Sequence, residues 1–273
     1  MEEDRIGIPA HLLGQEKGVR IPILHWGEGM ILLNKPQGIA SKQDPWYPDF
    51  PNMESVFNLQ IEAGKPELSH HKIHQFKVMN SLEPEVTGLV AVCTNEENSD
   101  EWTNTYGSNQ LEFGFLLIGS KFSEPKKIEC DHPIVRHHNG KKMQVSHRLG
   151  KQAKTVFHPL FNGRDAGAWL ALTSFPRFHQ IRLHAMESGV RLIKDPIYLP
   201  GTVEDPQGED RLKLDWMHAY SIKNHSSLET ESSVMALEPP KYWKRNLRKL
   251  GIEIEEVRVV ADEILQNKTL PEE

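Results

Sequence analysis

The chain has 273 residues, of which 38% are hydrophobic, and its formal net charge is −6 at pH 7. A chain of this length can bury a substantial core in one large domain or two smaller ones. It contains no apolar run of the ~18 to 20 residues that a membrane-spanning helix requires, which excludes that class of protein. The acidic start "MEEDRIGIPAHLLGQEKG" is unlike a secretory signal, so we expect a cytoplasmic protein.

The first half of the chain predicts strands separated by a long loop. Residues 1–28 show no clear periodicity and are expected to form an N-terminal arm. "MILLNKPQGI" predicts a buried strand that ends in a Lys-Pro-x-Gly turn. The four prolines of residues 41–66 favour a long loop with one short helix near 53–61. "GLVAVCT" and "LEFGFLLIGS" predict two strands, and the capping Asn and early acids of "NEENSDEWTNTYG" predict a helix between them.

The second half continues with strands and two more helices. "HHNG" and "NGRDAG" are typical of turns, and "AKTVFHPLF", "AWLALTSF" and "WMHAYSIKN" predict strands. "PRFHQIRLHAMESG" and "PPKYWKRNLRKLG" each combine an early Pro with a final Gly and predict helices. With no βαβ alternation, the pattern indicates an α+β fold with a mostly antiparallel mixed sheet. Residues 257–273 are expected to form a C-terminal tail.

Positive charge is concentrated in one segment. Residues 121–158 contain nine Lys or Arg against three acids, so the segment carries +6 and the remainder −12. A run of cations is often no more than a solvated surface, but it also suits binding of nucleic-acid phosphates. "RFHQIRLH" is a second dense polar segment, at a predicted helix N-terminus that could bind phosphate or carboxylate or could be a solvated face.

Cysteines and histidines give weaker signals. Cys93 and Cys130 are not in a C-x-x-C pair, so neither a disulfide framework nor a zinc knuckle is expected. His70 and His74 are four residues apart and could share a metal on a helix. Because no third ligand is nearby, we expect no metal site there.

Several motifs, taken in order, resemble one family. "RFHQIRLHAMESGVRLIKDPIY" is similar to the signature R-x-H-Q-I-R-x-H…D-P-x-Y of the RluA family of pseudouridine synthases. "WGEGMILLNKPQGI", "LEFGFLLIG", "HPIVRHHNGKKMQVSHRLGKQAKTVF" and "MHAYSI" resemble the family's other motifs. Together they cover about residues 22–250 in the family's order.

The resemblance implies a pseudouridine synthase fold, a bent and mostly antiparallel sheet with peripheral helices, over residues 29–256. Family members isomerise uridine in RNA to pseudouridine without cofactor or metal. We therefore expect RNA, ribosomal or transfer, as the partner, with no membrane or metal and with a monomeric chain. There is no room before Met30 for the small RNA-binding domain of many relatives, so this domain would have to hold the RNA itself.

The catalytic loop of the family is altered here. "NSLEPEVTGL", residues 80–89, aligns with His-Arg-Leu-Asp-x-x-Thr-Ser-Gly-Leu, so Glu83 stands in place of the catalytic Asp. The longer side chain moves the carboxylate by about an ångström, and such a displacement can cost ~10²-fold in rate. Ser81 replaces an Arg, Asn80 a His and Val86 a Thr. Phe113 replaces the Tyr that stacks on the target base, and Arg177 keeps the family's Arg, which is expected to pair with Glu83.

The predicted site therefore has a catalytic and an RNA-binding part. The catalytic residues are Glu83, Phe113 and Arg177. The expected RNA contacts are Ser81, Lys141, Lys142, Arg148, Lys151, Lys154, His179, Gln180 and Arg182.

Three functions remain open from the sequence. The favoured one is an RNA-binding homologue that has lost or weakened the isomerisation. The second is an active synthase that uses Glu83. The third is a non-RNA interaction protein, which the overall charge of −6 favours.

Overall fold

A computed structural model describes residues 4–27, 29–199, 217–225 and 233–266. The chain divides into two compact units, Met1–Gln110 and Leu111–Glu273. Within the described residues, no helix is both long and apolar enough to cross a membrane. Within each unit, the pairings of the described strands are antiparallel, as expected.

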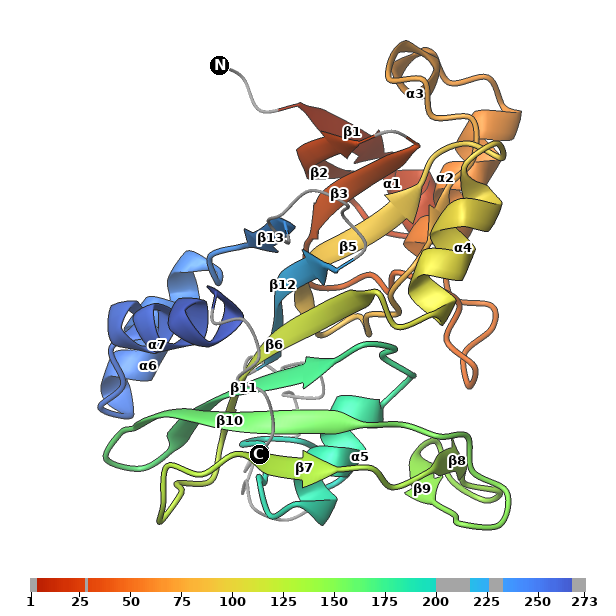
Figure 1. Ribbon diagram of the computed structural model, residues 1–273. Helices are drawn as coiled ribbons and strands as arrows, with labels where there is room; N and C mark the ends of the chain where they lie inside the picture. The colour runs from red at the N-terminus through yellow and green to blue at the C-terminus, as the bar shows by residue number, and fades with distance from the viewer. Residues whose placement is uncertain (1–3, 28, 200–216, 226–232, 267–273) are drawn as a thin grey trace. The chain divides into compact units, whose positions relative to one another are not determined.

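The first unit is built on a sheet in the order β1-β2-β3-β5, with β4 paired to β5 (Figure 1). Its strands are β1 (Arg5–Ile8), β2 (Val19–Gly27), β3 (Met30–Lys35), β4 (Lys77–Val78) and β5 (Thr87–Cys93). Every residue of β5 is buried, which explains why its sequence is a continuous apolar run rather than an alternating one.

Four helices belong to the first unit: α1 (Ala10–Leu13), α2 (Met53–Glu62), α3 (Pro66–His70) and α4 (Ser99–Gly107). Helix α2 begins at a capping box, in which the Asn52 side chain accepts from the backbone N–H of Ser55 at 3.0 Å. The Phe57 ring of α2 stacks on Phe76 at 4.4 Å between centroids, so α2 is fixed against the segment that leads into β4.

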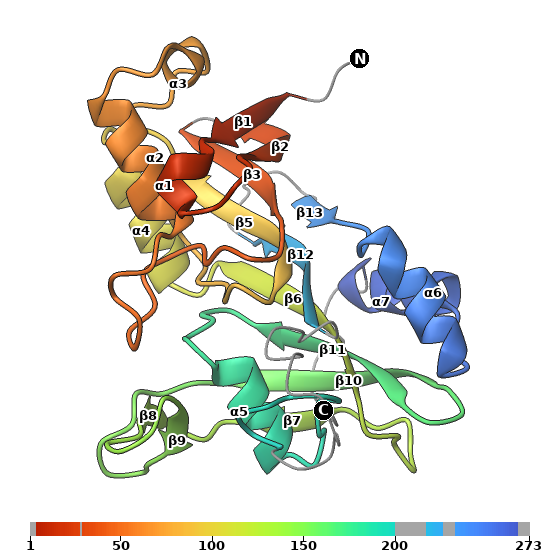
Figure 2. The same cartoon turned by 180° about the vertical axis from the view of Figure 1, so that it is seen from behind.

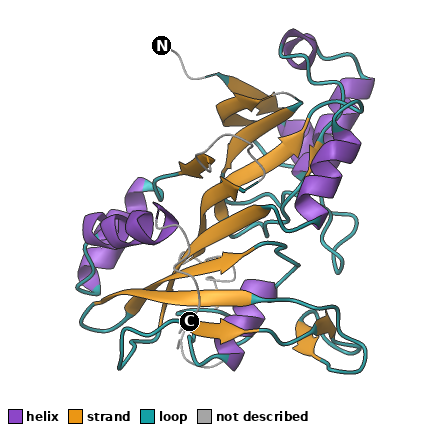
Figure 3. Ribbon diagram, in the orientation of Figure 1, coloured by secondary structure: helices purple, strands orange, loops and turns teal. Residues whose placement is uncertain are grey.

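The second unit contains a sheet in the order β12-β6-β11-β10-β7, with β13 paired to β12. Its strands are β6 (Leu111–Gly119), β7 (Ile128–Cys130), β10 (Thr155–Asn162), β11 (Gly167–Thr173), β12 (Met217–Asn224) and β13 (Ser233–Ala236). A separate hairpin of β8 (Ile134–Arg136) and β9 (Met143–Val145) lies beyond β7 (Figure 3).

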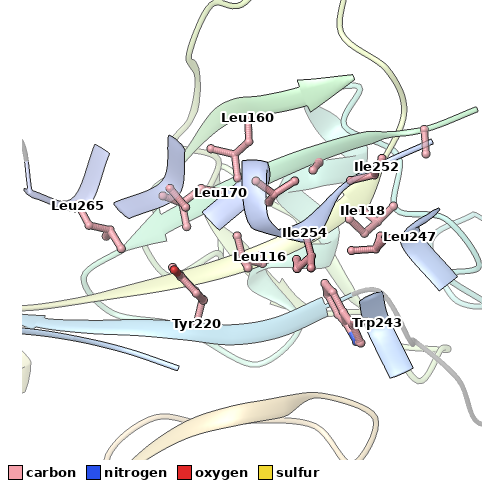
Figure 4. Packing of buried hydrophobic residues seen from close by; sticks show 14 residues of the cluster. Leu116, Ile118, Leu160, Leu170, Tyr220, Trp243, Leu247, Ile252, Ile254 and Leu265 are labelled. Carbon is pink, nitrogen blue, oxygen red and sulfur yellow. The ribbon is translucent and has the colours of Figure 1, made fainter. Parts of the chain in front are cut away.

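The sheet of the second unit is covered on both faces. Side chains of a strand alternate between faces, so Leu170 of β11 points to one side and Thr173 to the other. On the Leu170 side, α6 (Lys241–Lys249) and α7 (Ile254–Gln266) close a core that includes Leu116, Tyr220 and Trp243 (Figure 4). On the Thr173 side lies α5 (Gln180–Glu187), whose Gln180 bonds Thr173.

Most predicted elements are present, and the chain ends differ from expectation. The described part of the expected arm, residues 4–27, is not irregular, because β1 pairs with β2 and β2 with β3 in the sheet. Residues 257–266 are not a tail, because Val257, Ala261 and Leu265 of α7 are buried in the core. The expected tail residues 267–273 lie outside the described residues.

Candidate functional site

The loop that carries Glu83 is bound to β5 by a buried side-chain amide. Asn80 donates from Nδ2 to the carbonyl of Leu89 at 2.9 Å and accepts at Oδ1 from the N–H of Ala91 at 2.9 Å. The carboxamide therefore continues the ladder that β4 forms with β5. Asn80 thus has a structural role, and the backbone entering the loop is well defined.

A second set of bonds fixes the same loop to the segment that follows β3. The hydroxyl of Ser41 donates to the carbonyl of Asn80 at 3.0 Å and accepts from the N–H of Leu82 at 2.7 Å. The N–H of Gly38, where φ is +95°, donates to the carbonyl of Pro84 at 2.8 Å. The turn Lys-Pro-x-Gly is therefore the support of the Glu83 loop, and its Gly supplies a backbone conformation that other residues rarely adopt.

Lys35 places a positive charge behind this loop. The side chain is fully buried, and Nζ donates to the carbonyls of Ile39 at 2.6 Å and Pro36 at 2.9 Å. Burial lowers the pKa of Lys35 to about 7, and the charges of Glu85 and Glu83 oppose that shift. The ammonium and the two carboxylates attract each other, so the protonated Lys35 helps to hold the loop. Sequence reasoning missed this residue, although its signal was the Asn-Lys-Pro-x-Gly motif.

Glu83 itself is 6% exposed, and Ser81 beside it is half-buried. The loop closes in a turn, because the N–H of Val86 donates to the Glu83 carbonyl at 3.1 Å. The Glu83 loop is therefore a closed turn, and the alignment of Glu83 with the family's catalytic Asp stays a prediction.

Phe113 and Arg177 belong to the second unit. Phe113 lies on β6 opposite Thr173 of β11 and Ile222 of β12, and its ring is 1% exposed. Arg177 is half-buried just before α5; its Nε donates to the carbonyl of Gln152 at 2.9 Å, and its guanidinium lies 4.8 Å from the Phe175 ring centroid. The pairing of Arg177 with Glu83 stays a prediction.

A buried hydrogen-bond chain joins α5 to β10 and β11. Gln180 Nε2 donates to the hydroxyls of Thr173 at 3.0 Å and Thr155 at 3.1 Å. Thr155 in turn lies 2.9 Å from Nδ1 of His184, whose Nε2 is 2.8 Å from the carbonyl of His132. Since a carbonyl can only accept, Nε2 carries the His184 proton and Thr155 donates to Nδ1. Gln180 and His184, four residues apart on α5, therefore lie on one edge of the helix.

A second buried network surrounds Arg182. Its Nε and Nη2 donate to the two carboxylate oxygens of Asp195 at 2.8 and 2.6 Å, with both side chains 2% exposed. Burial alone would raise the pKa of Asp195, but the bonds and charge of Arg182, with backbone N–H groups of Tyr198 and Ile197, outweigh it and lower that pKa. The pair is therefore an ionised, bidentate salt bridge in the interior.

His179 connects this network to the basic hairpin. Its Nε2 accepts from Arg182 at 3.2 Å, so Nδ1 carries the proton and donates to the Tyr198 hydroxyl at 3.1 Å. That hydroxyl also accepts from the N–H of Met143 on β9 at 2.8 Å. His179 adopts a left-handed backbone with φ +55°, a conformation that these contacts maintain.

Three of the expected RNA contacts are buried instead of exposed. His179, Gln180 and Arg182 are 6%, 1% and 3% exposed, and their polar groups are bonded within the second unit. They build the site rather than present themselves to a nucleic acid. Sequence reasoning assigned no role to Thr155, Asp195 and Tyr198, although the motifs G-K-x-A-x-T and D-P-x-Y contain them.

The basic hairpin segment, residues 134–154, carries exposed cations, unlike the buried polar residues of α5. It contains six Lys or Arg and no acid. Lys141, Lys142, Arg148, Lys151 and Lys154 are all exposed. Lys154 also pairs at 3.0 Å with Glu129, which Lys127 contacts at 3.1 Å. The hydrogen bonds from Lys154 and Lys127, together with their charges, lower the pKa of Glu129.

The histidine pair considered for metal does not have the geometry it needed. Helix α3 ends at His70, and Lys72 after it has φ +53°, so His70 and His74 do not share a helix face. Within the described residues there is no cluster of three or more potential metal ligands.

The sequence is similar to those of curated pseudouridine synthases. The chain is 24% identical over 213 residues to ribosomal large subunit pseudouridine synthase D of Nitrosomonas europaea, covering 77% of this chain and 59% of that one. It is 26% identical over 207 residues to an uncharacterised RNA pseudouridine synthase of Synechocystis sp., covering 72% and 59%. The chain is a homologue of the RluA-type pseudouridine synthases.

Solved structures show that this homologue has the pseudouridine synthase fold. Human RNA pseudouridylate synthase domain containing 1 superposes with a TM-score of 0.62 at 15% identity, over 92% of this chain and 97% of that one. Human RNA pseudouridylate synthase domain containing 4 gives a TM-score of 0.63 at 16% identity, over 84% and 92%. No protein-family model matches the chain. The chain spans about three fifths of the length of the two curated relatives named above.

Proposed function

We propose that this homologue binds structured RNA, ribosomal or transfer, and that its isomerisation of uridine is lost or strongly weakened. The RNA-binding part rests on the basic hairpin segment, whose six cations are accompanied by no acid between residues 134 and 154. Cations in such a segment neutralise phosphates and give affinity that falls with salt but depends little on sequence.

The observation that carries the loss of activity is the loop at residues 80–89. Its backbone is fixed by Asn80, Ser41 and the Gly38 turn, so the loop cannot shift freely to compensate for a longer acidic side chain. A carboxylate displaced by about an ångström from its reacting position can cost ~10²-fold in rate. The burial of Glu83, which is 6% exposed, further supports the proposal, because a target base must reach its carboxylate.

A second candidate is an active synthase that uses Glu83 as its carboxylate. The buried Lys35 favours it, since the charge of Glu83 opposes the lowering of the Lys35 pKa by burial, so a cation acts near the Glu83 carboxylate. Arg177, if it pairs with Glu83 as the resemblance implies, would act in the same direction.

One experiment separates the two candidates. RNA isolated from cells grown with [5-³H]uridine is incubated with the full chain, and tritium release is measured beside filter binding of the same RNA at several salt concentrations. We expect salt-dependent binding and no release above that of Glu83→Gln. Release by the wild type well above this variant would establish the active synthase instead.

Shortening the acidic side chain at position 83 tests why the isomerisation is lost or weakened. Glu83→Asp restores the family's side-chain length without changing charge. If displacement is the main defect, release should rise above the wild-type level; if it stays at background while RNA still binds, the other changes in the loop, such as Ser81, are sufficient to prevent the reaction.

A further inference from the structure

Exposed apolar side chains gather on one part of the first unit. Across the described residues, six large hydrophobic side chains are exposed: Tyr47, Phe50, Leu59, Leu149, Tyr242 and Val259. Single exposed hydrophobics are normal on protein surfaces, whereas a group of them indicates a binding surface. Tyr47, Phe50 and Leu59 form such a group, because Phe50 and Leu59 line one groove and the Tyr47 ring stacks on Phe50 at 5.1 Å.

The groove lies between the end of α1, the proline-containing loop and α2, and its volume is about 580 Å³. Figure 2 shows α1 and α2 beside each other in the first unit. Leu12 and Leu13 of α1 form one wall, and Val56 and Leu59 of α2 form another. Phe50 is 64% exposed and Leu59 is 53% exposed, so both offer apolar surface to a partner.

The loop wall of the groove has a defined conformation. The side chain of Asp44 accepts from the N–H of Trp46 at 2.7 Å and stabilises the turn there. The N–H of Phe50 donates to the Tyr47 carbonyl at 3.1 Å. A bridge between Ala40 and Asn52 closes the loop at its base. A surface ordered in advance binds at a lower entropic cost than a flexible one.

The charge of the lining selects the kind of partner. Asp49 and Glu54 are the charged residues of the lining, and both are acidic; Glu54 accepts from the N–H of Val78 at 2.7 Å, whereas Asp49 is exposed. RNA phosphates would be repelled there, whereas lysine and arginine side chains would be attracted. We propose that the groove binds a short segment of another protein that combines basic with apolar side chains. Apolar side chains of the segment would pack on Phe50 and Leu59, and a cation of the segment would lie near the exposed Asp49.

Random dodecapeptides displayed on phage provide the probe. After selection on the immobilised full chain, we expect enriched sequences that contain Lys or Arg together with Leu, Ile, Phe or Trp. Their synthetic fluorescent versions should bind the wild type in anisotropy titrations, and Leu59→Glu should weaken binding by about tenfold or more, as expected for an apolar anchor. Asp49→Lys should also weaken it.

The matched control is Val259→Glu, which adds the same charge at an apolar side chain of similar exposure, 58% against 53%, on α7. It should leave peptide binding within about twofold of the wild type. Selection of no common sequence, selection of acidic sequences, or equal loss in the Leu59 and Val259 variants would overturn the proposal.

Two other occupants would give different results. If the groove joined two copies of this chain, light scattering would show a wild-type dimer that Leu59→Glu dissociates. If it held RNA, the same variant would lower RNA affinity. Either outcome overturns a protein partner, and neither depends on whether uridine is isomerised.

Discussion

The second unit contains two segments rich in cations and histidines, and the structure uses them in opposite ways. In residues 177–184, Arg182 and His184 are buried and bonded to fixed partners. In the basic hairpin segment, Lys142 and Arg148 are exposed with no acid within the segment. The polar groups of the first segment bond within the protein, whereas the side chains of Lys142 and Arg148 in the second are exposed to solvent.

The two segments are also connected. Arg177 donates to the carbonyl of Gln152, Gln180 donates to that of Lys154, and Tyr198 bonds Met143 at the base of the hairpin. A buried apolar cluster of Ile134, Ala153, Leu183 and Tyr198 lies beneath these bonds. The buried network therefore positions the exposed cations, and a cation's role is decided by the acceptors that surround it.

The largest effect should come from breaking the buried network. Asp195→Ala leaves Arg182 buried without its carboxylate, and loss of one partner of such a pair costs about 3–5 kcal/mol of unfolding free energy. Asp165→Ala is the matched control, because Arg164–Asp165 is an exposed pair at 2.8 Å. Urea unfolding followed by circular dichroism should separate the two variants clearly. If they unfold alike, the Arg182–Asp195 pair does not support the fold as described.

The helices and strands of the second unit could be predicted from the sequence. Which of its polar residues are buried, and which partners they bond, could not. Strands such as "LEFGFLLIGS" follow from hydrophobic runs, and the ends of α6 follow from Pro240 and Gly251. Residue type alone cannot tell that Arg182 meets Asp195, since the two are 13 residues apart and join only through the tertiary fold. The arm and tail were misjudged because short strands and an amphipathic helix gain their stability from packing.

The exposed segment is tested by removing its charge. The triple variant Lys142→Ala, Arg148→Ala and Lys151→Ala should lower RNA affinity by about tenfold or more at moderate salt, with a smaller salt slope. Its unfolding transition should stay near that of the wild type, because exposed side chains contribute little to stability. Filter binding at four salt concentrations measures both quantities.

A control with equal charge change shows whether position matters. Lys241→Ala, Arg245→Ala and Lys249→Ala remove three exposed cations of α6, on the sheet face opposite α5. This variant should lower affinity much less. An equal fall in both triple variants would mean that overall charge, and not the basic hairpin segment, governs binding.

A smaller effect should appear in the pH dependence of stability. Burial lowers the pKa of His184 below its ordinary 6.5, against the bond to the His132 carbonyl, which raises it. As the pH falls through 6.5, the unfolded chain binds a proton that the folded chain does not, so the folded state loses stability. His184→Gln lacks this proton. Between pH 7.5 and 5.5 the wild type should therefore lose more stability than the variant, by at most about 1.4 kcal/mol per pH unit. Parallel losses would show that His184 titrates alike in both states.

The smallest effect concerns Lys154, the last residue of the basic hairpin segment, which is exposed but already has an acidic partner. Its charge is exposed but already paired with Glu129, so Lys154→Ala should weaken RNA binding less than Lys151→Ala does. Glu129→Gln should have the opposite sign: it removes an anion that Lys154 and Lys127 now share, and both cations then become available to phosphates. Because exposed pairs are weak, we expect a rise in affinity of no more than about threefold, seen at low salt and absent at high salt. A fall in affinity would instead mean that Glu129 orients Lys154 toward the RNA.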